Sequence, residues 1–209
     1  MPILNSFSRS LDYELSIWKI FESEEELRSG LKISSFLKEK LDNKKSLNHR
    51  KSILAIRQLL KKMNVSDQNQ GYDDFGRPYL NDGRFISFSH SKSFACVVIS
   101  DKKIGIDIEK NQYKILNISS KFLNDSEKLF LSKNSISQIT QIWTAKEAVY
   151  KAFKIKGINF SEQIKVEPFS ENSLEGIANI FYNNEIFKFL LFFYKINNYS
   201  ATVAVSLYK

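Results

Sequence analysis

Residues 103–110 read KIGIDIEK, and the expected fold can be built outward from this stretch. Isoleucine stands at every second position from 104 to 108, and such alternation predicts a β-strand with one buried face. Side chains two residues apart on a strand point the same way, so Asp107 and Glu109 share the opposite face with Gly105. The strand therefore holds two negative charges side by side.

Two interpretations of this acidic pair stand open. A strand with one solvated face often carries Asp or Glu, and for an isolated strand that is the commoner situation. Alternatively, the pair binds a divalent cation such as Mg²⁺, which takes oxygen ligands and relieves the repulsion between neighbouring carboxylates. The choice between them depends on residues elsewhere in the chain.

The segments on both sides of this strand predict a mixed fold of helices and strands. Their apolar periods and their Gly- and Asn-rich turns mark the elements. Asn124, followed three residues later by Glu127, predicts a capping box at the start of a helix. The expected strands cover 11–20, 84–90, 94–100, 103–109, 177–182, 185–194 and 200–208, and the longer helices cover 46–63 and 137–153.

This order of elements predicts an α+β fold made of two similarly built halves that meet near residue 105. We expect an N-terminal lobe over 1–104 and a C-terminal lobe over 105–209. A chain of 209 residues is long enough for one large domain or two small lobes with proper cores.

Composition and net charge limit the classes of protein and partner. Hydrophobic residues make up 43% of the chain and aromatic residues 13%, which argues for a folded protein. The net charge of +8 suits an anionic partner, such as a nucleic acid, an anionic lipid, a phosphorylated small molecule or an acidic protein. No block of five or more basic residues forms a nucleic-acid-binding tail, so nucleic acid is not the favoured partner.

Cysteine and histidine are scarce. One cysteine, Cys96, and two histidines, His49 and His90, exclude a disulfide framework and argue against a structural zinc site. The N-terminus lacks the pattern of a secretion signal. The longest apolar run, 186–194, is interrupted by Lys188 and is too short to span a bilayer. We therefore expect a cytoplasmic protein that does not contact membranes.

The helix expected around residues 143–154, WTAKEAVYKAFK, supplies a third carboxylate. At about 100° per residue, its small apolar residues gather on one side, and Lys146, Glu147 and Lys151 gather with aromatic residues on the other. An ordinary amphipathic helix with a Glu147–Lys151 pair, worth about 0.3–0.5 kcal/mol, would show the same pattern. A carboxylate flanked by ammonium groups is also what a metal–phosphate site needs beside the acidic pair.

Taken together, the strand and the helix resemble the 4′-phosphopantetheinyl transferase superfamily, in its two-lobed, surfactin-synthetase-activating type. That family has a G-[IV]-D-x-E strand and a W-[ST]-x-K-E-[AS]-x-x-K helix. Both patterns are complete here, and their joint occurrence is far more specific than either motif alone. The matching residues are Gly105, Asp107 and Glu109 in the strand and Trp143, Lys146, Glu147 and Lys151 in the helix.

Two shorter stretches extend the resemblance. The family's G-K-P segment stands here as GRP, in which Arg77 keeps the positive charge but changes the geometry of a phosphate contact. The family's S-H-S motif is Ser89-His90-Ser91, followed by Lys92-Ser93 where glycine is frequent. An isolated His90 would be expected to bond to backbone at a strand end. The resemblance instead places His90, with Ser89 or Ser91, against a phosphate of coenzyme A.

An arginine-bearing helix precedes the GRP segment in the family. Here Arg50 and Arg57 lie seven residues apart, on one face of the helix expected over 46–63. A solvated basic face would show the same pattern. The resemblance implies that Arg50, with Arg57, grips the 3′-phosphate end of coenzyme A through forked hydrogen bonds.

The resemblance also implies a reaction. The family moves the phosphopantetheine arm of coenzyme A to a serine of an acyl or peptidyl carrier protein and releases adenosine 3′,5′-bisphosphate. Asp107, Glu109 and Glu147 would hold Mg²⁺ against the pyrophosphate, Lys146 and Lys151 would offset charge on the transferred group, and Glu147 would take the serine proton. The residues expected to bind coenzyme A are Arg50, Arg57, Arg77, Ser89, His90, Asp107, Lys146 and Lys151.

In architecture, the resemblance implies two lobes related by a pseudo-two-fold axis, a site in the cleft between them, and a monomer. Carrier proteins are typically acidic near the modified serine, so a basic surface would steer them to the cleft. One rival hypothesis is a non-catalytic carrier- or nucleotide-binding module of the same fold, in which three clustered carboxylates without a metal would be costly. Another is a nucleic-acid-binding protein, which only the net charge supports.

Overall fold

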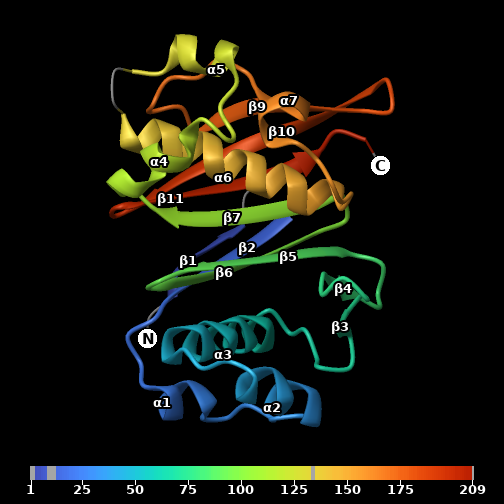
Figure 1. Ribbon diagram of the computed structural model, residues 1–209. Coiled ribbons are helices and arrows are strands. Elements are labelled where there is room, and N and C mark those ends of the chain that lie inside the picture. The colour runs from blue at the N-terminus through green and yellow to red at the C-terminus, as the bar shows by residue number, and fades with distance from the viewer. Residues whose placement is uncertain (1–2, 9–12, 133–134, 209) are drawn as a thin grey trace.

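The computed structural model describes residues 3–8, 13–132 and 135–208 and combines helices with antiparallel sheets (Figure 1). The predicted α+β class is confirmed. The strand expected over 11–20 is found from residue 13 to residue 19, and its first two residues lie outside the described part of the chain. The pseudo-two-fold relation between lobes and the boundary at residue 105 stay predictions.

The first half of the chain forms a four-stranded sheet in the order β1-β2-β6-β5, in which all neighbours are antiparallel. The longest helix of this half lies against one face of the sheet (Figure 1). Its buried residues Leu54 and Leu59 share a core with Ile86 and Val97 of the sheet. The elements are β1 (Ile3–Ser8), β2 (Tyr13–Lys19), α1 (Glu24–Arg28), α2 (Ser35–Asp42), α3 (Leu47–Lys62), β3 (Gln70–Tyr72), β4 (Pro78–Leu80), β5 (Phe85–Ser91) and β6 (Phe94–Ser100).

The second half forms a five-stranded antiparallel sheet in the order β7-β11-β10-β9-β8, with the helix α6 across one face (Figure 1). The small apolar residues Ala145, Ala148, Val149 and Ala152 of α6 are buried against this sheet, as their helical spacing predicts. The elements are β7 (Ile104–Lys110), a 3-10 turn (Tyr113–Ile115), α4 (Leu116–Ser119), α5 (Asp125–Phe130), α6 (Ile136–Phe153), α7 (Phe160–Gln163), β8 (Ile164–Val166), β9 (Glu175–Tyr182), β10 (Glu185–Ile196) and β11 (Tyr199–Ser206).

A third core joins the two sheets. Leu15 and Cys96 from the first sheet are buried together with Ile106, Ile108 and other residues of the second. The isoleucines of β7 thus face the first sheet, and the strand lies between α6 and β5 in Figure 1. β7 therefore lies where the two halves meet, together with residues of β10 and β11 in the same core.

Local sequence signals explain several ends of elements. Asn124 and Glu127 form the predicted capping box at the start of α5. The Asn-Asn turn between β9 and β10 has left-handed backbone at Asn183 and Asn184, which asparagine tolerates well. Among the helices of the described residues, none is long and apolar enough to cross a lipid bilayer.

Candidate active site

Glycine at position 105 allows β7 and α6 to touch through their backbones. A Cβ atom built on Gly105 would lie 1.9 Å from the carbonyl oxygen of Ala148 and 2.8 Å from the amide nitrogen of Ala152. These alanines directly follow Glu147 and Lys151 in the sequence. The close approach therefore brings the helix carboxylate and ammonium to the strand that carries the acidic pair.

Asp107 is the best-anchored residue of the candidate site. Its Oδ1 accepts hydrogen bonds from Lys151 Nζ at 2.7 Å and from Ser89 Oγ at 2.7 Å. Its second oxygen, Oδ2, is buried and has no hydrogen-bond partner among the described residues. Lys151 Nζ also donates to the carbonyl of Ile106 at 3.1 Å, which fixes the ammonium beside the strand.

The three predicted carboxylates influence one another electrostatically. Burial, and then the charges of Asp107 and Glu109 against the opposing Lys151, raise the pKa of Glu147 to about 7. Burial and then the charge of Asp107 also raise the pKa of Glu109. Burial alone would lower the pKa of Lys151, but Asp107 and Glu147 outweigh it and raise this pKa. At Glu147, repulsion by Asp107 and Glu109 therefore outweighs attraction by Lys151.

The residues present fit a divalent cation. Within residues 3–8, 13–132 and 135–208, no three carboxylate, imidazole or thiol groups already converge as a ready ligand set. However, the unpartnered Oδ2 of Asp107 is the kind of buried anionic atom that a cation satisfies. Carboxylate oxygens are also the ligands that Mg²⁺ prefers. The ligand set Asp107, Glu109 and Glu147 stays a prediction that this chemistry supports.

A cavity of about 210 Å³ lies between the two halves beside this group. Arg77 and Pro78 line one wall, and Tyr150, Lys151 and Lys154 of the α6 end line the other. The guanidinium of Arg77 donates a hydrogen bond to the carbonyl of Lys154 across the gap. Three cationic side chains thus meet in one small cavity, which suits phosphate oxygens.

A second cavity, of about 300 Å³, adjoins the first and shares Gly76, Pro78 and Phe88 with it. Lys40, Lys44, His49 and Arg57 add a basic wall, and His90 lines the same cavity, while its expected contact with a phosphate stays a prediction. The rings of His49 and His90 are 5.7 Å apart. Partial burial, and then the charges of His49 and Lys151, lower the pKa of His90.

The two arginines of α3 are placed differently from each other. Arg50 donates to Glu24 Oε2 at 2.8 Å and to the carbonyls of Lys44 and Lys45, so its guanidinium braces the turn before α3. Arg57 is buried, donates to Gln70 Oε1 at 2.5 Å and lines the basic cavity. Of the two arginines, only Arg57 lines the basic cavity, and the expected contact with coenzyme A stays a prediction.

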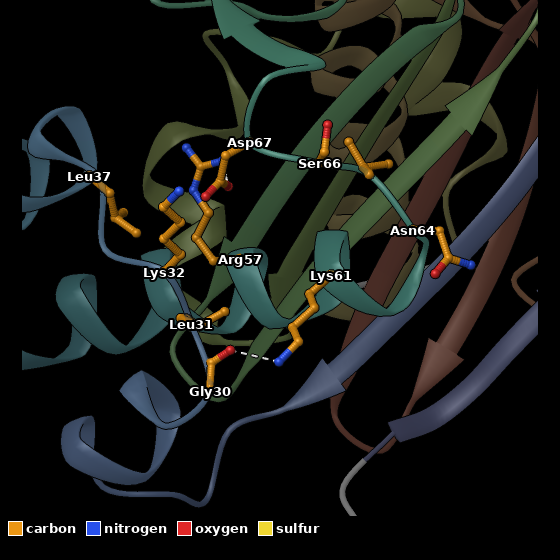
Figure 2. A pocket seen from close by; sticks show the side chains of 10 residues that line it. Gly30, Leu31, Lys32, Leu37, Arg57, Lys61, Asn64, Ser66 and Asp67 are labelled. Atoms are coloured by element: carbon orange, nitrogen blue, oxygen red, sulfur yellow. Dashed lines mark hydrogen bonds and ion pairs between the residues drawn. The ribbon is translucent and has the colours of Figure 1, made fainter.

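A further cavity, of about 390 Å³, is also lined by Arg57 and is drawn from close by in Figure 2. Its lining residues all come from the first half of the chain, between Gly30 and Asp67. Lys61 Nζ closes one end by donating to the Gly30 carbonyl at 2.6 Å (Figure 2). This cavity shares only Arg57 with the basic cavity and no lining residue with the cavity between the halves, so it is set apart from the candidate site.

Comparison with known proteins shows which family the chain resembles in sequence. Residues 103–204, about half of the chain, match the sequence profile of the 4′-phosphopantetheinyl transferase superfamily. The chain belongs to this superfamily. The matched residues include the acidic pair of β7 and the whole of α6, the elements that meet at Gly105.

Two similar proteins align with part of the chain. Enterobactin synthase component D from Salmonella typhi is 36% identical over 88 residues, which are 40% of this chain and 38% of that relative. 4′-Phosphopantetheinyl transferase gsp from Aneurinibacillus migulanus is 28% identical over 106 residues, which are 48% of this chain and 45% of that relative. The chain thus aligns with less than half the length of either relative.

One part of the helix prediction is wrong. Lys146 does not lie on the polar side of α6 with Glu147, because its side chain is 0% exposed. Its ammonium contacts Glu127 Oε2 at 2.8 Å and donates to the carbonyls of Phe122 and Phe160 at 2.6 and 2.8 Å. Lys146 therefore ties α6 to α5, to α7 and to the turn before α5. Lys151 instead contacts Asp107, and Glu147 lies close enough to Asp107 to be affected by its charge.

This buried pair predicts a large effect on stability. We expect Lys146→Met to lower the free energy of unfolding by about 3–5 kcal/mol, because it leaves the Glu127 carboxylate buried without a countercharge. Urea unfolding monitored by circular dichroism measures the change. Lys128→Met is the control, since Lys128 pairs with the exposed Asp125 and should cost less than about 1 kcal/mol. Equal, small losses in both variants would contradict this role for Lys146.

The structure also adds residues that the sequence did not single out. Lys40, Lys44 and His49 line the basic cavity, and Lys154 lines the cavity between the halves. Helical spacing could have identified Lys154, because it places this residue on the polar side of α6, one turn after Tyr150. Lys40 lies in α2, Lys44 in the turn after it and His49 in α3, and none of the three belongs to a motif, so no sequence signal distinguished them from other surface residues.

Proposed function

We propose that this chain transfers the 4′-phosphopantetheine arm of coenzyme A to a serine of an acyl or peptidyl carrier protein. Adenosine 3′,5′-bisphosphate is the other product, and the reaction depends on Mg²⁺. The proposal extends to the whole chain an activity that one relative carries in its name. All proposed site residues come from one chain, so a monomer suffices.

The observation that carries this proposal is the arrangement around Asp107. One of its oxygens is held by Lys151, the other is buried and unpartnered, and a cavity with three cationic groups opens beside them. A metal-assisted phosphoryl transfer needs carboxylates for the cation and separate cations for the phosphate oxygens. A plain structural ion pair would not leave a buried carboxylate oxygen without a donor.

The phosphate groups of coenzyme A have partners of opposite charge in the proposed site. We propose that Arg57, His90 and the lysines of the basic cavity bind the 3′-phosphate end, and that Arg77 and Lys151 contact the pyrophosphate. Asp107, Glu109 and Glu147 would hold Mg²⁺, which when bound neutralises charge on the pyrophosphate oxygens. Ser89 and Lys146 are left out of these contacts, because their polar atoms bond within the protein.

The chain's own residues then position the reacting groups. Lys151 lies within hydrogen-bonding distance of Asp107 and can offset charge on the transferred phosphoryl group from the cavity wall. Glu147 accepts the proton of the carrier serine, directly or through a water molecule. Both side chains come from α6, so one rigid helix sets their spacing.

Mass spectrometry tests the proposed function directly. The protein is mixed with coenzyme A, Mg²⁺ and an apo carrier protein, and the carrier should gain the mass of one phosphopantetheine group. A non-catalytic binding module would bind coenzyme A or the carrier without this gain. Parallel reactions with an acyl and a peptidyl carrier decide which class is modified.

We expect carrier modification to weaken with salt more steeply than coenzyme A binding does. The net charge of +8 should speed encounter with an acidic carrier through long-range attraction, which salt screens. Bound coenzyme A sits in half-enclosed cavities where screening is weaker. The measurement compares kcat/KM for the carrier with the Kd for coenzyme A between low and physiological ionic strength. Equal salt dependence of the two quantities would contradict a steering role.

A further inference from the structure

We propose that Ser89 and Ser91 of β5 are positioning residues for the acidic pair of β7. Each hydroxyl holds one oxygen of a carboxylate, so that the other oxygen is presented to a divalent cation. The inference rests on the proposed function, because that reaction is what requires the cation.

Side-chain hydroxyls of β5 accept hydrogen bonds from the backbone of β7 where the two strands lie side by side. These strands belong to different sheets, yet the backbone N–H of Ile106 donates to Ser87 Oγ at 3.2 Å and that of Ile108 donates to Ser89 Oγ at 3.3 Å. Serines at every second position of β5 point the same way, which matches the two-residue period of Gly105, Asp107 and Glu109. The hydroxyls therefore meet β7 in register with its acidic face.

The contacts of Ser89 fix the direction of its single hydroxyl proton. The N–H of Ile108 occupies a lone pair of Oγ, and the proton is donated to Asp107 Oδ1 at 2.7 Å. Lys151 binds the same oxygen. Two donors on Oδ1 and none on the buried Oδ2 give this carboxylate one fixed and one available oxygen.

Glu109, two residues further along β7, also accepts a hydrogen bond from a serine of β5. Ser91 Oγ donates to Glu109 Oε2 at 2.9 Å. Across residues 3–8, 13–132 and 135–208, no hydrogen bond reaches the other oxygen, Oε1. Hydrogen bonds that orient a ligating carboxylate are typical of the surroundings of metal ligands. Ser87, by contrast, lies opposite Gly105, where β7 has no carboxylate.

Ser91→Ala tests the inference without relying on catalysis. Binding of Mn²⁺ in the presence of coenzyme A is followed by electron paramagnetic resonance. We expect the alanine variant to raise the Kd for Mn²⁺ about tenfold or more, because loss of such a partner typically costs 10–100-fold. Ser91→Thr keeps the hydroxyl and should restore the wild-type Kd. In activity assays, Ser91→Ala should need more Mg²⁺ for half-maximal rate and recover its kcat at saturating Mg²⁺.

Ser87→Ala is the matched control for the hydrogen bonding between β5 and β7, because Ser87 contacts the backbone of β7 but no carboxylate. It removes a hydroxyl from the same strand and should lower the urea midpoint, but leave the Kd for Mn²⁺ unchanged. The inference is overturned if Ser91→Ala binds Mn²⁺ as the wild type does, if Ser87→Ala weakens binding equally, or if the wild type binds no Mn²⁺. A wild type that binds Mn²⁺ but modifies no carrier contradicts the proposed function alone, and the Mn²⁺ comparison still decides this inference.

Discussion

Glu147→Gln should reduce carrier modification by roughly 10³-fold or more, while the protein stays folded. The substitution keeps the size of the side chain but removes a proposed cation ligand and the proposed acceptor of the serine proton. Single-turnover mass spectrometry of the carrier measures the loss. Because Arg57 and the basic cavity are untouched, the Kd for coenzyme A without metal should change little.

The same substitution should alter how stability depends on pH. Burial, followed by the charges of Asp107 and Glu109, raises the pKa of Glu147 from 4.5 to about 7 in the folded protein. Between these values the folded state binds more protons than the unfolded state, so wild-type stability falls as pH rises. Glu147→Gln lacks this titration. Without metal, its urea midpoint should therefore fall less between pH 5 and pH 8 than that of the wild type.

Glu162→Gln provides a control, because Glu162 is an exposed carboxylate on α7. It should leave both carrier modification and the pH dependence of stability as they are. Full activity in Glu147→Gln would refute the role of Glu147 in the reaction. Loss of activity together with an unfolded circular dichroism spectrum would contradict the expectation that the fold tolerates this change.

The sequence predicted the elements that meet at the site, because their signals are local. Alternation identified β7, and helical spacing identified the apolar side of α6, whose alanines are buried as expected. The joint motif then linked two segments that no local rule connects. Glu147 and Lys151 reach the surroundings of Asp107 because each is one step from an alanine that touches β7.

The remaining placements depend on contacts between distant segments. Adjacent residues on a helix differ by about 100°, so helical spacing left both Lys146 and Glu147 on the polar side. In the structure Lys146 is buried, and its ammonium contacts the backbone carbonyls of Phe122 and Phe160 and the carboxylate of Glu127. Their positions are set by tertiary packing, which the period of a single helix does not contain.

Arg50, in the first half of the chain, also has a tertiary contact that helical spacing could not predict. Its spacing from Arg57 placed both on one helix face, and the resemblance implied a phosphate contact there. Glu24, 26 residues earlier in the sequence, pairs with Arg50 instead. The serines of β5 are a related case. Their spacing was visible in the S-H-S motif, whereas their register against β7 depends on how the two sheets meet.

Gly105→Ala should have the largest effect on structure and activity together. The new methyl group would lie 1.9 Å from the Ala148 carbonyl, so β7 and α6 must separate by more than 1 Å to relieve the contact. Overpacking of this kind costs about 1–3 kcal/mol or more. A displacement of about 1 Å between reacting groups can reduce rate about 10²-fold. We therefore expect a lower urea midpoint and, in the folded fraction, at least a hundredfold loss of carrier modification.

Two further variants show whether backbone contact is the cause. Gly176→Ala also adds a methyl group to a strand of the second sheet, but there it meets the Phe193 ring at 2.9 Å, and a side chain can move more easily than a helix. It should cost less stability and leave the distance between α6 and β7 unchanged. Ala148→Gly combined with Gly105→Ala should give no rescue, because the obstructing atom is the carbonyl oxygen of residue 148, which glycine retains. Recovery of activity in that double variant would show that side-chain volume, and not the backbone approach, limits position 105.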